Sequence, residues 1–371
     1  MLPKEIYQKT TGYFLEPIRV LLEDPAVSEI LVNGPGTIYF EKAGKLQLAK
    51  AKFPDAASLM AAVRNIAEYV NRRIDADHPS MDARLPDGSR VHVIIPPCSR
   101  VGVCISIRKF QRSFFDLDFL VKQSSLSPET AEFLQLVVLL HKNAIISGGT
   151  GSGKTSLLNA LSKTIPEAER IVVIEDSSEL QLHQPHTVYL EAQPARPDGK
   201  GQVTIRQLFA DSLRMRPDRI IVGEVRRGEA LDLVQSMLSG HAGALSTVHA
   251  NTPRDALIRL ETLCLMSDVA LPVYVARLQV ASAIHLVVQI ARYADGSRRI
   301  QAISEVLGLD EHQNYRVQDL YRFEAAGLDA QGKLQGQLAA CGVRPTFAAE
   351  PWRMGFGDRV KLTQGMFARP D

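Results

Sequence analysis

The chain has 371 residues, a length typical of two domains. Hydrophobic residues make up 45% of it and charged residues 23%, which is ordinary for a globular protein and excludes an intrinsically disordered chain. Lys and Arg number 43 against 41 for Asp and Glu, and the resulting net charge of +2 argues against a protein that coats nucleic acid.

The sequence has no feature of a membrane-spanning or exported protein. Its longest apolar runs, such as 136–140 and 284–288, are far shorter than the roughly 20 residues of a spanning helix. Residues 1–17 contain neither the apolar segment nor the small-residue cleavage site of a signal peptide. The cysteines form no C-x-x-C pair, so we expect no zinc site and no disulfide framework; they are Cys98, Cys104, Cys264 and Cys341.

Residues 1–108 have the pattern of an α+β domain. Turn sequences such as Asn33-Gly34-Pro35-Gly36 and Pro86-Asp87-Gly88 separate short apolar runs. Helical spacing of apolar residues follows Asp55, a good residue to begin a helix. The elements expected here are helices at 17–22 and 54–70 and strands at 29–32, 37–41, 90–95 and 103–107.

The pattern changes after Arg108. Residues 109–127 are polar with short aromatic clusters and are interpreted as an interdomain linker. From residue 128 helices alternate with β-branched runs that are typical of strands covered on both faces, which predicts a parallel sheet with crossover helices. The elements expected are helices at 129–141 and 154–162 and strands at 143–147, 170–175 and 219–223. Residues 325–371, rich in Gly and Ala, are interpreted as a tail with little structure of its own.

The strongest functional signal is the sequence GGTGSGKT at 148–155, which fits the P-loop pattern G-x-x-x-x-G-K-[ST] between a predicted strand and a predicted helix. Glycines let backbone N–H groups surround phosphates, and the helix N-terminus adds positive potential. Lys154 is expected to reach the β- and γ-phosphates and Thr155 to bind Mg²⁺. The predicted nucleotide-binding residues are Gly148, Gly149, Thr150, Gly151, Ser152, Gly153, Lys154, Thr155 and Ser156.

Two further predicted strands end in carboxylates. The strand at 219–223 is followed by Glu224, which could polarise water for attack on a γ-phosphate, although alone it could equally be a solvated strand end. Many P-loop enzymes have a metal-binding Asp before this Glu, whereas this chain has Gly223. The strand at 171–175 ends in Glu175, with Glu179 shortly after, and such acids could hold Mg²⁺ through its waters or merely cap a turn.

A third polar segment, Ser246 to Asn251, contains His249. An imidazole at that strand end could sense the γ-phosphate, but a lone histidine is often structural, and periodicity does not decide between the two.

The stretch LRMRPDRIIVGEVRRGEALDLVQSMLSGHAGALSTVHANTPRDALIRLE resembles the type II/IV secretion-system ATPase superfamily, and within it the tight-adherence (Tad) pilus assembly ATPases. The resemblance extends from about residue 25 to residue 324. It includes VSEILVNGPG, MDARLPDGSRVHVIIPP, ISIRKF, VIEDSSELQL and LPVYVARLQVASAIHLVVQ, in the order in which the family has them. The sequence departs from some relatives in lacking a long N-terminal extension and a tetracysteine metal module.

The resemblance implies an α/β fold, with a small PAS-like N-terminal domain (1–108), a RecA-like P-loop ATPase domain (128–324) and nucleotide bound between them in a hexameric ring. It implies catalytic roles for Lys154 and Glu175, and it places Glu175 with Glu179 in the "Asp box". Glu224 falls in an atypical Walker B strand, in which Gly usually precedes the Glu, and His249 falls in the "His box"; both are implied to be catalytic. Arg90 and Arg108 match N-terminal arginines that contact phosphates in relatives, a task suited to the planar guanidinium; otherwise they are solvated strand arginines.

The function expected from the resemblance is an ATP-hydrolysing motor, with Mg²⁺ and no zinc, at the cytoplasmic face of the inner membrane. Its partners would be further copies of itself and the inner-membrane platform proteins of a pilus or secretion machine. The alternatives within this class are a conjugation-type or a twitching-retraction ATPase. A nucleic-acid translocase is the alternative from another class, since arginines cluster between residues 206 and 227, but acidic residues alternate with them. A nucleotide-binding scaffold without hydrolysis is disfavoured by Glu224.

Overall fold

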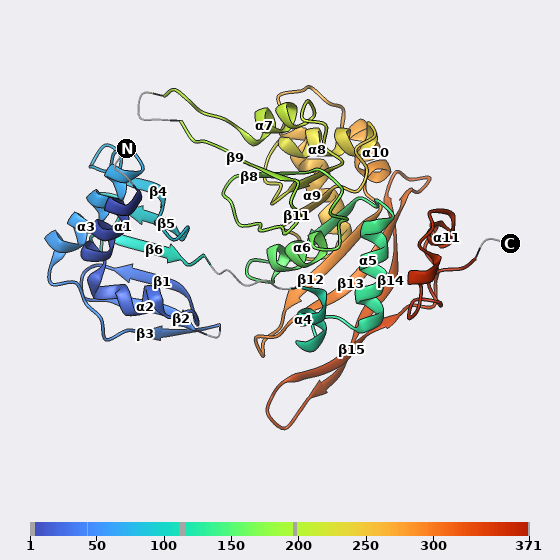
Figure 1. Ribbon diagram of the computed structural model, residues 1–371, viewed down its shortest axis with the longest axis horizontal. Helices are drawn as coiled ribbons and strands as arrows, with labels where there is room; N and C mark the ends of the chain where they lie inside the picture. The colour runs from blue at the N-terminus through green and yellow to red at the C-terminus, as the bar shows by residue number, and fades with distance from the viewer. Residues whose placement is uncertain (1–3, 43, 111–115, 196–198, 370–371) are drawn as a thin grey trace. The chain divides into compact units, whose positions relative to one another are not determined.

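The computed structural model describes residues 4–42, 44–110, 116–195 and 199–369 (Figure 1). The chain divides into two compact units, one of residues 1–113 with 195–202 and one of residues 114–194 with 203–371. Within the described ranges, no helix is both long and apolar enough to span a membrane.

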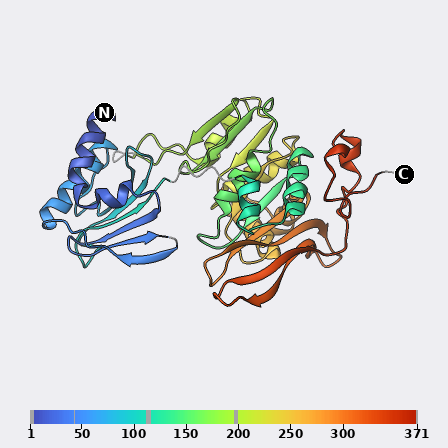
Figure 2. The same ribbon diagram turned by 60° about the horizontal axis from the view of Figure 1, so that its bottom comes forward.

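The first unit is an antiparallel sheet of six strands, in the order β3-β2-β1-β6-β5-β4, with helices packed on it (Figure 2). Apolar residues of α3 at helical spacing, such as Leu59, Val63 and Ile66, pack with strand residues such as Ile30 in one core. The Asp55 carboxylate accepts a hydrogen bond from the Ser58 N–H and caps α3, as the sequence predicted. The elements are α1 Lys4–Phe14, η1 Glu16–Ile18, α2 Arg19–Glu23, β1 Val27–Asn33, β2 Ile38–Lys42, β3 Lys45–Leu48, α3 Ala56–Tyr69, β4 Ser80–Arg84, β5 Arg90–Ile94 and β6 Cys104–Arg108.

Three of these elements were not expected from the sequence. The strand β3 has only four residues, KLQL, all of them exposed, so its alternation of polar and apolar side chains is too short to reveal a strand. The strand β4 buries only Met81, and the helix α1 has no recognisable cap sequence.

The second unit is built on a nine-stranded sheet in the order β15-β14-β13-β12-β7-β11-β10-β8-β9. Six strands are parallel to one another, in the spatial order β12, β7, β11, β10, β8 and β9. Beyond β12, the strands β13, β14 and β15 extend the sheet as antiparallel hairpins, orange to red in Figure 1. The prediction of a parallel sheet is therefore confirmed. The strands are β7 Ala144–Ser147, β8 Ile171–Glu175, β9 Thr187–Glu191, β10 Arg219–Val222, β11 Leu245–Val248, β12 Leu286–Arg292, β13 Arg298–Leu309, β14 Tyr315–Leu328 and β15 Leu334–Ala340.

Helices cover both faces of the parallel strands. Ile146 and Val173 pack in one core with α5 and α6, while their neighbours Ile145 and Val172 pack in a second core with α8, α9 and α10. This alternation explains why the strands are continuous apolar runs in the sequence. The helices are α4 Leu117–Lys122, α5 Pro128–Leu139, α6 Lys154–Ser162, α7 Ile205–Ser212, α8 Glu229–Leu238, α9 Pro253–Leu265, α10 Val273–Ala283, α11 Glu350–Arg353 and η2 Gly357–Arg359.

The predicted linker at 109–127 contains a helix. Asp116 caps α4 by accepting a hydrogen bond from the Phe119 N–H, and Leu117 joins the core of the second unit. Residues 111–115, in the middle of the predicted linker, lie outside the described residues. Residues 116–127 therefore belong to the second unit.

The expected C-terminal tail also differs from the prediction. Residues 325–340 complete β14 and form β15, and the segment after β15 packs on α5. Phe133 of α5 contacts the rings of Phe347 and Phe367, and the Glu132 carboxylate accepts hydrogen bonds from the backbone N–H groups of residues 361–363. The sequence did not predict this packing, because the aromatic residues involved are scattered through a segment rich in Gly and Ala and their contacts are with residues far away in the chain.

Candidate nucleotide site

The P-loop lies between β7 and α6, as the motif predicts. Gly151 and Gly153 adopt φ angles of +68° and +100°, a left-handed conformation that favours glycine. The Ser152 hydroxyl donates a hydrogen bond to the Gly149 carbonyl over 2.9 Å and closes the loop. A Cβ atom on Gly148 would lie 2.3 Å from the Ile290 carbonyl oxygen, so only glycine fits there. The loop thus has the curled backbone that surrounds phosphates.

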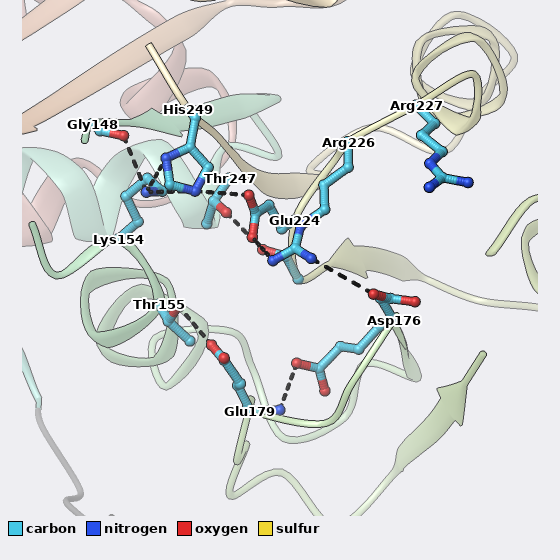
Figure 3. Close-up of polar contacts among 12 residues, drawn as sticks. Gly148, Lys154, Thr155, Asp176, Glu179, Glu224, Arg226, Arg227, Thr247 and His249 are labelled. Atoms are coloured by element: carbon cyan, nitrogen blue, oxygen red, sulfur yellow. Dashed lines mark hydrogen bonds and ion pairs between the residues drawn. The ribbon is translucent and has the colours of Figure 1, made fainter. Parts of the chain in front are cut away.

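Lys154 projects from the first turn of α6 into this loop and is 7% exposed. Its Nζ donates to the carbonyl oxygens of Gly148 over 3.1 Å and of Gly149 over 3.0 Å, and lies 3.3 Å from Nδ1 of His249 (Figure 3). Residues 95 positions apart in the sequence therefore meet at the carboxyl ends of neighbouring strands.

Glu224 lies on the other side of the His249 ring. Its Oε1 is 2.9 Å from His249 Nε2, and its Oε2 accepts a hydrogen bond from Arg226 over 2.8 Å (Figure 3). Partial burial raises the pKa of Glu224, but the hydrogen bond from Arg226 and the positive charges of Arg226 and Lys154 outweigh it and hold the pKa below its usual value. Glu224 is therefore ionised at neutral pH and able to accept a proton.

His249 connects the lysine to the glutamate. Burial, and then the positive charge of Lys154, lower the pKa of His249, so the ring is neutral at pH 7. A neutral ring with its proton on Nε2 donates to Glu224 and presents Nδ1 as an acceptor to Lys154. The sequence prediction singled out His249 by resemblance, and the structure brings it together with Lys154 and Glu224.

Gly223, the residue before Glu224, is explained by its neighbour Glu175. A Cβ atom on Gly223 would lie 2.9 Å from Cγ and 3.0 Å from Oε1 of Glu175, so a side chain at position 223 would displace this carboxylate. Glu175 is 4% exposed, and its Oε1 accepts hydrogen bonds from the N–H groups of Glu179 over 2.8 Å and Leu180 over 3.0 Å. Glu175 thus holds the loop that carries Glu179.

That loop places the Glu179 carboxylate against the P-loop helix. Thr155 Oγ1 donates to Glu179 Oε2 over 3.1 Å (Figure 3). A hydroxyl and a carboxylate are hard oxygen ligands of the kind that suit Mg²⁺, which retains several waters in nucleotide sites. Among the described residues no three His, Cys, Asp or Glu side chains form a metal-binding group. The donor set therefore fits Mg²⁺ held together with phosphate oxygens.

Arg90 and Arg108 lie in the first unit, on β5 and β6. They are directly opposite each other in the antiparallel ladder, so the first unit brings the two predicted phosphate-contacting residues together.

The arginines between 206 and 227, which suggested nucleic-acid binding, do not form one basic surface. Arg219 is fully buried, with Nε 2.5 Å from Glu169 Oε2, and Arg206 pairs with Asp232 and Asp268. Arg226 pairs with Glu224 and Asp176. The sequence prediction assigned no catalytic role to Arg226, although its place two residues after Glu224 was a usable signal.

A P-loop that follows β7, the central strand of the nine-stranded sheet, with an ionised glutamate at the end of β10 two strands away, places the second unit among the RecA-like P-loop proteins. The comparison with known families is more specific. Residues 14–332 match the model of the type II/IV secretion system protein family. The chain belongs to this family, which confirms the superfamily resemblance.

Individual relatives agree with this assignment. The chain is 34% identical to a putative conjugal transfer protein of Mycobacterium tuberculosis over 301 residues, which cover 80% of this chain and 84% of the relative. It is also 34% identical to the type IV secretion system protein PtlH of Bordetella pertussis over 318 residues, 79% and 94% of the two chains. The fold is similar to that of the ATPase DotB of Legionella pneumophila, with a TM-score of 0.54, 17% identity and coverage of 81% and 82%.

Proposed function

We propose that this chain is an ATP-hydrolysing motor of a secretion or pilus machine. The observation that carries the proposal is the convergence of Lys154, His249 and Glu224 at one P-loop, because these groups supply phosphate binding and a base within one hydrogen-bonded chain. The family match and the relatives named for conjugal transfer and type IV secretion support the cellular role.

The proposed chemistry begins with Lys154. Its ammonium group exchanges the carbonyls of Gly148 and Gly149 for the β- and γ-phosphates of ATP. Glu224 takes a proton from the water that attacks the γ-phosphorus, and the bond to the ADP oxygen breaks. A general base of this kind contributes on the order of 10²–10⁴-fold to the rate.

His249 couples these two events. While Lys154 contacts Nδ1, the Nε2 proton of His249 holds Oε1 of Glu224. When Lys154 moves to a phosphate, His249 loses this contact and can turn toward the γ-phosphate, which leaves Glu224 Oε1 available for water. The base is thus engaged only when nucleotide is present.

Thr155 and Glu179 are the residues that would hold Mg²⁺. The Glu175 carboxylate positions Glu179 by accepting a hydrogen bond from the Glu179 backbone N–H. The ion would neutralise phosphate charge as the leaving oxygen develops its negative charge.

The motor would act as a homohexamer at the cytoplasmic face of the inner membrane, with platform proteins of the machine as partners. Arg90 and Arg108 would add positive charge to the phosphates when the first unit closes on nucleotide, and closure would be stronger with ATP than with ADP. This difference would convert hydrolysis into movement of the first unit. A Tad-type pilus motor remains our proposal, and the relatives' names favour conjugation-type secretion as the second candidate.

The test uses Lys154→Ala and Glu224→Gln in the full chain. We expect Lys154→Ala to lose nucleotide affinity and turnover, and Glu224→Gln to bind ATP while its turnover falls on the order of 10²–10⁴-fold. Size measured with and without a non-hydrolysable ATP analogue tests the hexamer, and stimulation by DNA would favour the nucleic-acid translocase instead. Wild-type turnover in either variant would overturn the proposed function.

A further inference from the structure

The β12–β13 hairpin forms the outer wall of the P-loop. The strand β12 runs parallel beside β7 and passes the loop before the chain turns back into β13. The carbonyl oxygen of Ile290 would lie 2.3 Å from a Cβ on Gly148, and its Cδ1 3.5 Å from a Cβ on Gly153. Both ends of the P-loop therefore rest on one residue of this hairpin.

Arg298, the first residue of β13, contacts the middle of the loop. Its Nε donates a hydrogen bond to the Gly151 carbonyl over 3.0 Å, and its Cδ would lie 3.3 Å from a Cβ on Gly153. In a trans peptide the Gly151 carbonyl and the Ser152 N–H point in opposite directions. Holding the carbonyl outward therefore turns the Ser152 N–H inward, where it contacts the Gly149 carbonyl that also accepts from Lys154.

A second guanidinium lies at the same glycine. Arg292 is directly opposite Arg298 in the β12–β13 ladder, and its Nη1 would lie 3.7 Å from a Cβ on Gly151. Two guanidinium groups therefore lie at the Gly151 turn of the P-loop, and that of Arg298 donates a hydrogen bond to the Gly151 carbonyl.

The hairpin is itself firmly held. Arg299 donates hydrogen bonds to the carbonyls of Ser124 and Leu334, and the Ile300 N–H donates to the Ser125 carbonyl over 2.9 Å. The Asp295 carboxylate in the hairpin turn accepts from the Leu334 N–H over 2.8 Å. Groups carried on a fixed element are preorganised for binding.

We propose that Arg298 is a positioning residue for the P-loop: its hydrogen bond to the Gly151 carbonyl holds the Ser152 N–H inward, toward the phosphates of a bound nucleoside polyphosphate. The inference rests on the proposed ATP binding and adds to it. Lys154 acts from the inner side of the loop, whereas Arg298 acts from the outer side through the Gly151 carbonyl. Because the loop shape that Arg298 holds serves bound ATP and the transition state alike, its loss should raise KM and leave kcat unchanged.

The experiment measures Kd for a fluorescent ATP analogue by anisotropy, KM and kcat for ATP, and the thermal midpoint, all in the full chain. Arg298→Ala should raise Kd and KM roughly 5- to 10-fold, the effect of one net hydrogen bond, with kcat within about twofold. Arg298→Lys keeps the charge without the Nε donor and should recover only part of the affinity. Arg292→Ala removes the neighbouring guanidinium but not the hydrogen bond from Arg298 to Gly151, so it should raise Kd less than Arg298→Ala.

The control is Arg322→Ala, an exposed arginine on β14 of the same sheet that pairs with Asp319. It should leave Kd unchanged. If Arg298→Ala binds the analogue as wild type does, if Arg298→Lys binds no better than Arg298→Ala, or if affinity falls only in step with the thermal midpoint, the inference is overturned. If Lys154→Ala retains affinity, the proposed function fails instead, which separates the two.

Discussion

The ion pair of Arg219 and Glu169 gives a quantitative prediction of stability against pH. Arg219 has no exposed surface, and its Nε and Nη2 lie 2.5 Å and 3.3 Å from the two oxygens of Glu169. The guanidinium also donates to the carbonyls of Val138 and Gly243, which ties α5 and the loop before β11 to the start of β10. Glu169→Gln would leave this buried charge without its counter-charge.

The magnitude follows from the pKa. Burial raises the pKa of Glu169, but hydrogen bonds from His141 and Arg219 and their charges outweigh it and lower the pKa to about 2. At roughly 1.36 kcal/mol per pH unit, the ion pair contributes about 3 kcal/mol to the free energy of unfolding at pH 7. Because the folded-state pKa is depressed, this contribution is complete above the unfolded-state pKa, decreases as pH falls below about 4.5, and is about half lost at pH 3.

The assay is urea unfolding followed by the fluorescence of Trp352, the one tryptophan of the chain, which packs against the core of the second unit. Glu169→Gln should lose about 3 kcal/mol at pH 7 and progressively less at pH 4 and pH 3. Glu167→Gln, an exposed neighbour, should change stability by less than about 0.5 kcal/mol. A deficit below about 1 kcal/mol at pH 7, or one that stays constant down to pH 3, would refute this reasoning.

Two further predictions concern the second unit, which contains the P-loop, and the first unit, which contains Arg90 and Arg108. Gly223→Ala should push the Glu175 carboxylate away from the Glu179 N–H. ATP turnover should then fall about tenfold, and the Mg²⁺ concentration needed for the half-maximal rate should rise. An unchanged Mg²⁺ dependence would contradict the role of Gly223. Arg108→Ala, and to a lesser degree Arg90→Ala, should reduce turnover of the full chain and abolish any ATP-dependent protease sensitivity between residues 109 and 127. The exposed Arg100→Ala serves as their control, and normal turnover with an intact protease response in Arg108→Ala would remove the closure mechanism.

Much of the site could be predicted because its residues occupy strand ends. The P-loop, Glu224 and His249 each follow a buried strand, and parallel strands bring their carboxyl ends to one edge. Their mutual contacts could not be predicted, since the bridge from Lys154 through His249 to Glu224 depends on side-chain orientation. The same holds for Gly223, whose role appears only when Glu175 of the adjacent strand is placed beside it.

The parts of the fold that were missed have physical reasons. The strand β3 has only four residues, too few for their alternation of polar and apolar side chains to indicate a strand. The C-terminal segment is stabilised by contacts with residues about 200 positions earlier, such as Lys142 with Glu350 over 2.7 Å. Local composition carries no information about such contacts.

The packing of Phe347 and Phe367 on Phe133 has a consequence for biosynthesis. The helix α5 precedes the P-loop in the chain, but the aromatic rings that cover its Phe133 are translated more than 200 residues later. While the ribosome is still adding residues up to about 367, this part of the core stays open to water and to other nascent chains. Folding of the second unit can therefore finish only after Phe367 has been translated, and a chain released before Phe367 would carry a wetted apolar surface that favours capture by chaperones or aggregation.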